Sequence, residues 1–227
     1  MNTFRALNIS RIIFVIPYLY LLLQGCTGGP KEANKEKKEV TARPDSGNLF
    51  DGKTLNGWEI TNFGPQGPVE VSGASIILGI GDGCTGITWK GNFPEINYEV
   101  TLEAMRVAGN DFFCGMTFPV GKFPCTLIIG GWGGTVVGLS CINGKDASQN
   151  ETTTLRKFEK GRWYRIRLRV TEKEIKAWID DDNVVNFTVD DKQLSIRPEV
   201  QLSRPFGIAS WNTRASLREI RVRKLLQ

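Results

Sequence analysis

The segment from residue 111 to residue 140 most constrains the fold, because it contains three short β-type runs in direct succession. Residues 111–118 and 123–129 are rich in aromatic and β-branched side chains, which favour strands. Pro119 between them suits the second position of a tight turn. A turn centred between Pro119 and Val120 places Cys114 directly opposite Cys125, so the segment is predicted to form a β-hairpin.

A glycine-rich break follows this hairpin. Gly130, Gly131, Gly133 and Gly134 surround Trp132, and residues 135–140 begin a third strand. Glycines have no side chain that can cover the indole. Trp132 is therefore predicted either to stand exposed above the sheet or to pack against bare backbone.

The rest of the chain after residue 47 repeats the pattern of short apolar, β-branched or aromatic runs separated by turn residues. The further candidate strands are residues 58–61, 69–71, 75–79, 86–89, 98–106, 153–155, 163–171, 174–179, 183–189, 206–211 and 216–223. Residues 162–170 alternate between polar and apolar side chains, which is typical of a half-buried antiparallel strand. Only residues 193–197 look helical, and Pro198 is expected to end that helix. The pattern predicts an all-β jelly-roll β-sandwich of two antiparallel sheets.

The first 25 residues are predicted to be a signal peptide. Arg5 and Arg11 precede an apolar run, residues 12–23, that is short for a membrane span. Leu23, Gln24 and Gly25 then lead into Cys26, a pattern that resembles a bacterial lipobox and implies lipidation of Cys26. An ordinary signal peptide is the alternative.

Residues 26–47 hold almost nothing that a core could bury and are predicted to be a disordered tether. Residues 48–227 are predicted to form the β-sandwich domain. We therefore expect a protein of the bacterial cell envelope, held at a membrane through the lipid on Cys26, with the outer membrane favoured.

Charge and composition exclude several classes of function. Residues 48–227 hold 22 basic and 20 acidic side chains, which gives no reason to expect a nucleic-acid-binding surface. The chain contains no histidine, which excludes histidine metal ligands, histidine acid/base catalysis and every Ser–His or Cys–His nucleophile.

Residues 49–58, LFDGKTLNGW, resemble the opening signature of the domain family named 3-keto-disaccharide hydrolase. Residues 98–106, 161–164 and 217–222 are similar to later strands of the same family. The resemblance implies a concanavalin A-like β-sandwich with a concave, sugar-facing sheet, and hydrolysis or lyase cleavage of 3-keto-glycosides. Where the family places histidines, this chain has Ala177 and Trp211.

The candidate site residues follow from these strands and loops. Glu103 and Asp111 are the predicted catalytic carboxylates, because glycoside cleavage uses a pair of them. Predicted contacts to a carbohydrate ligand come from Arg106, Asn110, Trp132, Asp146, Glu151 and Trp211. For each of these residues the alternative is a structural role: a solvated strand face, a turn, a surface loop or a core aromatic.

Two classes of function remain open. One is an envelope hydrolase or lyase acting on 3-keto-glycosides, and the other is a non-catalytic, lectin-like carbohydrate-binding module. No cofactor is indicated with certainty. A divalent metal such as calcium is an alternative reading of the adjacent carboxylates Asp180, Asp181 and Asp182, which otherwise form a hairpin turn.

Four cysteines remain in the predicted domain, in a compartment that permits disulfides. In the predicted hairpin Cys114 lies directly opposite Cys125, so a disulfide between them is one of two outcomes. The other outcome is free thiols.

Overall fold

The computed structural model describes residues 46–226. The predicted signal peptide, the lipidation of Cys26 and the tether as far as residue 45 lie outside the described residues. Strand β1 (Ser46–Asn48) begins two residues before the predicted start of the domain. Within the described range, no helix is both long and apolar enough to cross a membrane.

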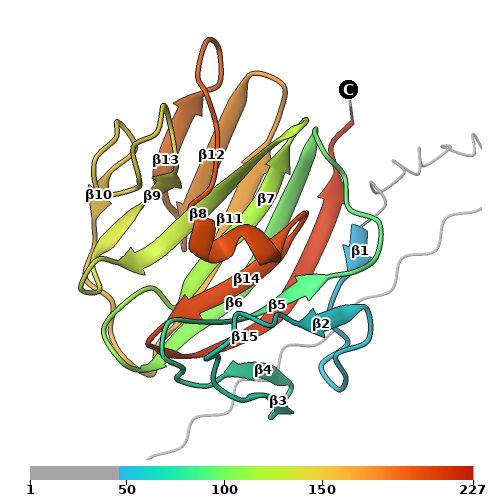
Figure 1. Cartoon of the computed structure of the whole chain (residues 1–227). Helices are drawn as coiled ribbons and strands as arrows, with labels where there is room; N and C mark the ends of the chain where they lie inside the picture. The colour runs from blue at the N-terminus through green and yellow to red at the C-terminus, as the bar shows by residue number, and fades with distance from the viewer. Residues whose placement is uncertain (1–45, 227) are drawn as a thin grey trace, which may run out of the picture. The chain divides into compact units, whose positions relative to one another are not determined.

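Two antiparallel sheets form the domain (Figure 1). The eight-stranded sheet contains β13 (Asp182–Thr188), β12 (Glu174–Ile179), β11 (Trp163–Val170), β6 (Tyr98–Ala108), β15 (Arg214–Lys224), β4 (Ser75–Leu78) and β3 (Val69–Ser72) in that order, with β1 also paired to β15. The seven-stranded sheet contains β10 (Thr154–Leu155), β9 (Val136–Ser140), β8 (Phe123–Gly131), β7 (Cys114–Val120), β14 (Gly207–Trp211), β5 (Cys84–Trp89) and β2 (Trp58–Ile60). The predicted class, an all-β sandwich of two antiparallel sheets, is confirmed.

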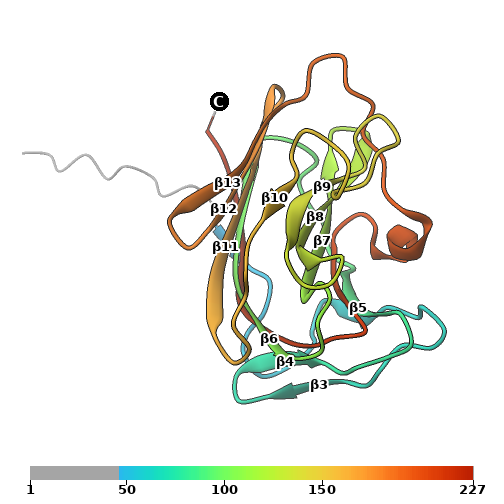
Figure 2. The same ribbon diagram turned by 90° about the vertical axis from the view of Figure 1, so that its left-hand side faces the viewer.

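The core lies between the two sheets, which face each other in Figure 2. Strand β11 supplies one wall of the core through the fully buried side chains of Tyr164, Ile166, Leu168 and Val170. The alternate residues of β11 point to the outer face of the eight-stranded sheet, as the sequence pattern predicted.

The hairpin of β7 and β8 exists, but its predicted register is wrong. Phe118 pairs with Cys125, and Cys114 pairs with Ile129. The turn lies at Gly121, which has a φ of 58°, a value that glycine adopts without strain. Pro119 is therefore part of strand β7 and lies opposite Pro124 rather than in the turn.

The disulfide outcome fails together with this register. Cys114 and Cys125 are free thiols, buried between the sheets. Burial raises the pKa of both thiols to about 12. Both side chains serve as small apolar core residues.

The predicted helix at residues 193–197 is also wrong. A short 3₁₀ helix, η1 (Pro198–Ser203), begins at the proline that was expected to end a helix. Proline fits there because the first residues of a helix donate no intrahelical hydrogen bond. The segment with η1 lies on the outer face of the seven-stranded sheet and contacts β5 and β14 (Figure 2).

Candidate functional site

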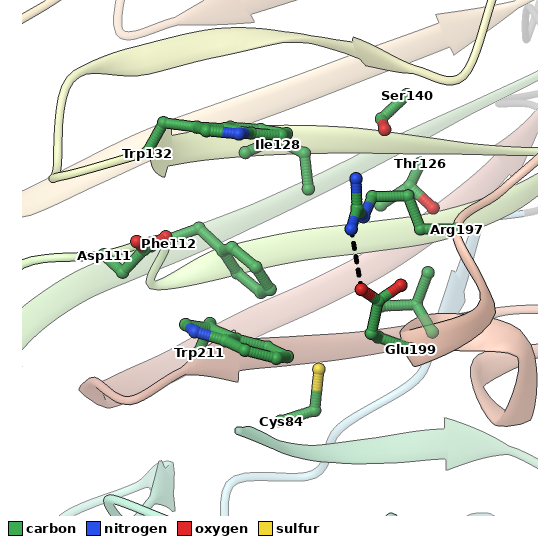
Figure 3. Close-up of a pocket in the computed structure, with 11 residues that line it drawn as sticks. Cys84, Asp111, Phe112, Thr126, Ile128, Trp132, Ser140, Arg197, Glu199 and Trp211 are labelled. Atoms are coloured by element: carbon green, nitrogen blue, oxygen red, sulfur yellow. Dashed lines mark hydrogen bonds and ion pairs between the residues drawn. The ribbon is translucent and has the colours of Figure 1, made fainter. Parts of the chain in front are cut away.

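A pocket of about 250 Å³ opens on the outer face of the seven-stranded sheet, beside η1 (Figure 3). Its walls combine aromatic rings, two carboxylates and one guanidinium group. The lining residues are Cys84, Asp111, Phe112, Thr126, Ile128, Trp132, Ser140, Arg197, Glu199, Val200 and Trp211. Asp111, Trp132 and Trp211, which were predicted separately from the sequence, therefore meet in one place.

Trp132 lies on the turn between β8 and β9. Its backbone has a φ of 47°, and 40% of its surface is exposed. Of the two outcomes predicted for this indole, the exposed one is therefore correct. The ring is available to stack on a ligand, in the way aromatic side chains contact flat apolar surfaces.

Arg106 supports the Trp132 turn from inside the sandwich. It is only 5% exposed, and its Nη2 donates hydrogen bonds to the carbonyls of Gly130 (3.0 Å) and Gly134 (2.9 Å). Its guanidinium group lies 5.1 Å from the centre of the Phe113 ring. Burial lowers the pKa of Arg106, against the opposing effect of nearby Asp111. Arg106 was predicted to bind substrate, but it is buried in the core and stabilises the turn through these hydrogen bonds.

Asp111 connects the Trp132 turn to the start of β7. Its Oδ1 accepts a hydrogen bond from the backbone N–H of Phe112 (2.7 Å), and its Oδ2 accepts one from Gly133 (3.4 Å). The backbone N–H of Trp211 donates to the carbonyl of Phe112 at 3.0 Å, and the two rings lie 6.4 Å apart. Asp111, Phe112 and the two tryptophans thus form one connected wall.

The opposite wall comes from the segment that leads into η1. Arg197 donates through Nη2 to Glu199 (2.7 Å) and through Nη1 to Asp146 (3.3 Å). The hydrogen bond from Arg197 lowers the pKa of Glu199. Asp146 does not line the pocket itself, but it holds the guanidinium group that does.

Cys84 presents its thiol to the pocket, between Trp211 and Glu199 in Figure 3. Burial, with a smaller contribution from the negative charge of Glu199, raises the pKa of this thiol to about 12. The thiol therefore stays protonated at neutral pH and is a poor nucleophile, since only the thiolate reacts.

Glu103 does not lie in the pocket, so the prediction that it shares a cleft with Asp111 is wrong. Alternation along β6 turns Glu103 to the outer face of the eight-stranded sheet, while Arg106 three residues later points inward. The Glu103 carboxylate accepts a hydrogen bond from Arg218 Nε at 2.6 Å. The two predicted catalytic carboxylates therefore lie on opposite outer faces of the sandwich.

Two other predicted contacts also lie outside the pocket lining. Asn110 is exposed beside Asp111 without facing the ligand space. Glu151 forms a surface ion pair with Lys192 at 2.8 Å, and this hydrogen bond lowers the pKa of Glu151.

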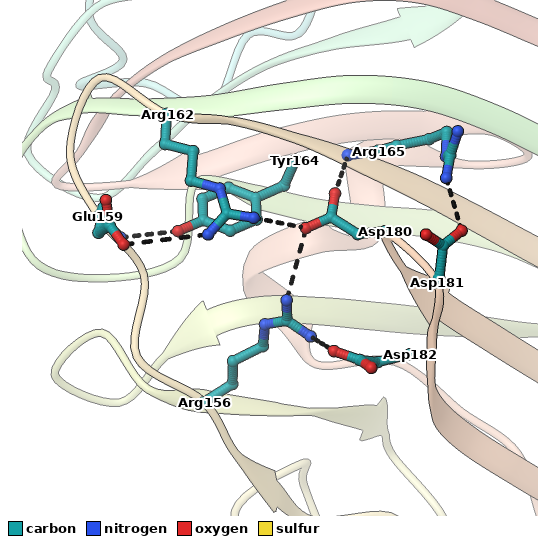
Figure 4. Close-up of polar contacts among 8 residues, drawn as sticks. All are labelled: Arg156, Glu159, Arg162, Tyr164, Arg165, Asp180, Asp181 and Asp182. Carbon is teal, nitrogen blue, oxygen red and sulfur yellow. Dashed lines mark hydrogen bonds and ion pairs between the residues drawn. The ribbon is translucent and has the colours of Figure 1, made fainter.

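The run Asp180, Asp181 and Asp182 closes the β12–β13 hairpin, where each carboxylate pairs with an arginine (Figure 4). Asp180 accepts hydrogen bonds from Arg162 Nη2 and from the backbone N–H of Arg165, both at 3.0 Å. Across residues 46–226, no three His, Cys, Asp or Glu side chains gather in a way that would hold a metal ion.

Sequence reasoning missed Phe112, Arg197 and Glu199. A signal for Glu199 was present, because proline followed by an acidic residue is typical of the first turn of a helix. Phe112 and Arg197 carry no such signal. They meet only because the segment before η1 folds across the sheet.

The fold is shared with several solved carbohydrate-related proteins of low sequence identity. The Crh5 transglycosylase in complex with NAG has a TM-score of 0.55 and 13% identity, covering 81% of this chain and 84% of its own. A laminarinase from Flavobacterium sp. UMI-01 has a TM-score of 0.51 and 13% identity, covering 79% of this chain and 98% of its own. The carbohydrate recognition domain of Emp46p has a TM-score of 0.52 and 12% identity, covering 80% and 96%.

These similarities define the fold as a concanavalin-like, laminarinase-type sandwich. A search of curated proteins found no match. The model of the 3-keto-alpha-glucoside-1,2-lyase-like domain matches residues 45–223. The chain belongs to this domain family.

Proposed function

We propose that the pocket binds one sugar unit of a 3-keto-glycoside and that the domain cleaves the adjacent glycosidic bond. Family membership and the fold shared with carbohydrate-related proteins support a sugar ligand. The observation that carries the proposal is the exposed Trp132 ring facing a pocket that also holds Asp111 and Glu199. At about 250 Å³ the pocket suits one small unit, since sites for drug-sized ligands begin at roughly 300 Å³.

The reaction we favour is elimination. A carbonyl at C3 of the sugar makes the C2–H bond acidic. Asp111 takes the C2 proton, the electron pair of that bond forms the C1–C2 double bond, and the C1–oxygen bond breaks. The leaving oxygen keeps the electron pair of the broken bond and takes up a proton from water. A donor close to the C3 oxygen stabilises the negative charge that develops there. Arg197 is the cationic donor in the pocket wall.

This assignment needs no histidine, because the ketone in the substrate supplies the acidity. Carboxylates serve as the base in other enzymes that remove a proton next to a carbonyl group. Hydrolysis at the same carboxylates is the other form of the family activity. In that reaction a second carboxylic acid must protonate the leaving oxygen.

A carbohydrate-binding module without turnover is the second candidate. It is favoured by the hydrogen bonds that already engage both pocket carboxylates, from Phe112 and Gly133 to Asp111 and from Arg197 to Glu199. These hydrogen bonds occupy carboxylate lone pairs that a base would need in order to accept a proton.

One set of variants separates the two candidates by measuring binding and turnover of a 3-keto-glucoside. Trp132→Ala should weaken binding by about 1 kcal/mol, or roughly fivefold in Kd, because a stacking contact is lost. Trp163→Ala, which removes an indole on the other outer face, is the matched control and should bind normally. Asp111→Asn should bind and lose turnover, whereas Glu103→Gln should retain both.

Wild-type binding without any turnover would support the binding module. Unchanged binding in Trp132→Ala would refute the pocket as the sugar site.

We also propose that the domain works in the bacterial cell envelope, attached through a lipid on Cys26. This part rests on the sequence of the leader alone. Such an anchor would hold the pocket at the cell envelope, where glycans from outside the cell can reach it.

A further inference from the structure

The outer face of the eight-stranded sheet carries a regular grid of arginines, which the proposed function does not use. Strand β6 runs through the middle, with β11 on one side and β15 on the other. Across the three strands the paired residues form three rows. The rows are Arg165–Glu103–Arg218, Arg167–Thr101–Arg221 and Arg169–Glu99–Arg223. The two outer rows have a carboxylate at the centre, and the middle row has a threonine.

A β-bulge creates this arrangement. Regular alternation on β15 would turn Arg218 and Arg221 to opposite faces, because they are three residues apart. The register shifts between them, and Glu219 at the shift has a φ of 55°. Bulges commonly redirect side chains in this way.

In the row with Glu99, two arginines bind one carboxylate. The Glu99 side chain is only 3% exposed, and its two oxygens are held from opposite sides. Arg169 donates to Oε2 through Nε (3.0 Å) and Nη2 (2.8 Å). Arg223 donates to Oε1 through Nε (2.9 Å) and Nη2 (2.6 Å). Two guanidinium groups on these strands can therefore reach one carboxylate above β6.

The middle row also has an arginine on each side, Arg167 and Arg221, but Thr101 stands between them in place of a glutamate. Arg167 stacks on Trp178 at 3.9 Å from the ring centre, and the oxygen of Glu99 nearest to it is also 3.9 Å away. Arg221 contacts Glu219, whose side chain is 56% exposed. Exposed ion pairs of this kind contribute little stability, so a ligand can compete with Glu219.

We propose that the space above Thr101, between Arg167 and Arg221, binds a carboxylate of an acidic polysaccharide. Arginine suits this role because its planar fork matches a carboxylate in two parallel hydrogen bonds. The site lies on the face opposite the sugar pocket. The domain thus holds an anionic glycan with one sheet while the other sheet carries the pocket.

Charge density selects a uronic acid polymer over other polyanions. Neighbouring rows are about 7 Å apart, and the adjacent rows are already filled by Glu99 and Glu103. The grid therefore accepts isolated charges, whereas double-stranded DNA carries one charge per roughly 1.7 Å. Anionic membranes attract clusters of about four to eight free basic residues, and most arginines here are already paired.

The test fills the middle row. Thr101→Glu gives it the same composition as its neighbours, and Thr101→Gln is the neutral control of matched size. We expect the wild-type protein to bind oligogalacturonate with an affinity that falls as salt rises. Thr101→Glu should lose at least tenfold in affinity, while Thr101→Gln stays within about threefold. A melting temperature of Thr101→Glu equal to or above that of the wild type shows that the sheet is intact.

Two further variants keep the proposal falsifiable. Arg221→Gln, at an exposed side chain, should weaken oligogalacturonate binding even if Thr101→Glu folds poorly. Trp132→Ala should bind oligogalacturonate normally, so failure of the sugar pocket and failure of the grid give different results. The proposal is overturned if wild type does not bind, if Thr101→Glu or Arg221→Gln binds like wild type, or if Trp132→Ala abolishes binding. Tighter binding to DNA or to phosphatidylglycerol vesicles also overturns it.

Discussion

Replacing Arg106 by methionine tests whether a buried charge holds the Trp132 turn. The substitution keeps the apolar part of the side chain, but removes the guanidinium group with its contact to the Phe113 ring and both hydrogen bonds to the carbonyls of Gly130 and Gly134. Each bond from a charged donor contributes roughly 1.5–3 kcal/mol, and the carbonyls would be left without that partner.

A gain offsets part of this loss. The Nε of Arg106 is buried without a hydrogen-bond partner, and burial lowers the pKa of the group. Burying such a charge is costly, so its removal recovers some of the lost free energy. We expect a net destabilisation of about 3 kcal/mol, which corresponds to a fall in Tm of roughly 6–12 °C for a domain of this size.

The assay is thermal unfolding together with sugar binding. Arg106→Met should lower the Tm and also weaken sugar binding, because the turn that carries Trp132 loses its support. Arg106→Lys should recover part of both, since a single nitrogen makes both bonds. Arg214→Met, at a half-exposed side chain, is the matched control and should change little. A Tm of Arg106→Met within about 2 °C of wild type, with unchanged binding, would refute the reasoning.

Three further predictions concern acid, thiols and the leader. The hydrogen bond from Arg197 lowers the pKa of Glu199 in the folded protein. The pair therefore stabilises the fold at pH values above the pKa that Glu199 has in the unfolded chain. This stabilisation is lost as the pH falls through the pKa of Glu199 in the folded protein. Wild type should therefore be more stable than Glu199→Gln at pH 7, and this difference should vanish in acid. Denaturant titrations at several pH values measure the difference. A difference that stays constant with pH would contradict the prediction. Burial raises the pKa of Cys84 and Cys114 to about 12, so iodoacetamide at pH 8 should label them only after unfolding, and rapid labelling of the folded protein would contradict the burial. Cys26→Ser should release the protein from membranes or stall its processing, whereas wild type recovered in a soluble, unlipidated form would remove the anchor.

The β-sandwich could be predicted because its strands are short, frequent and separated by turn residues. The alternation along β11 gave both the strand and the direction of each of its side chains. The register of the β7–β8 hairpin was wrong because it depended on one proline. Proline fits the end of a strand as well as a turn. In the register that the structure shows, Cys114 and Cys125 are not opposite each other, and both are free thiols in the core.

The site could be predicted only where a residue stood out by itself. Trp132 was found because glycines surround it, and Asp111 because it stands at the start of a predicted strand. Glu103 was misplaced because nothing local shows which outer face of a sandwich carries the pocket. Arg197 and Glu199 reach the pocket through the path of the chain after β13. Such tertiary proximity has no local sequence pattern.

The position of β15 has a consequence for how the domain is made. This last strand pairs with β6 along one edge and with β1 and β4 along the other, so the final residues of the fold fill the middle of the eight-stranded sheet. Ser46 lies opposite Arg223, so the first and last strands of the described fold are neighbours. The eight-stranded sheet is therefore incomplete until β15 is in place, and β6 has one unpaired edge until then. Such long-range pairing predicts slow folding, with the edge of β6 open to wrong pairing until β15 docks.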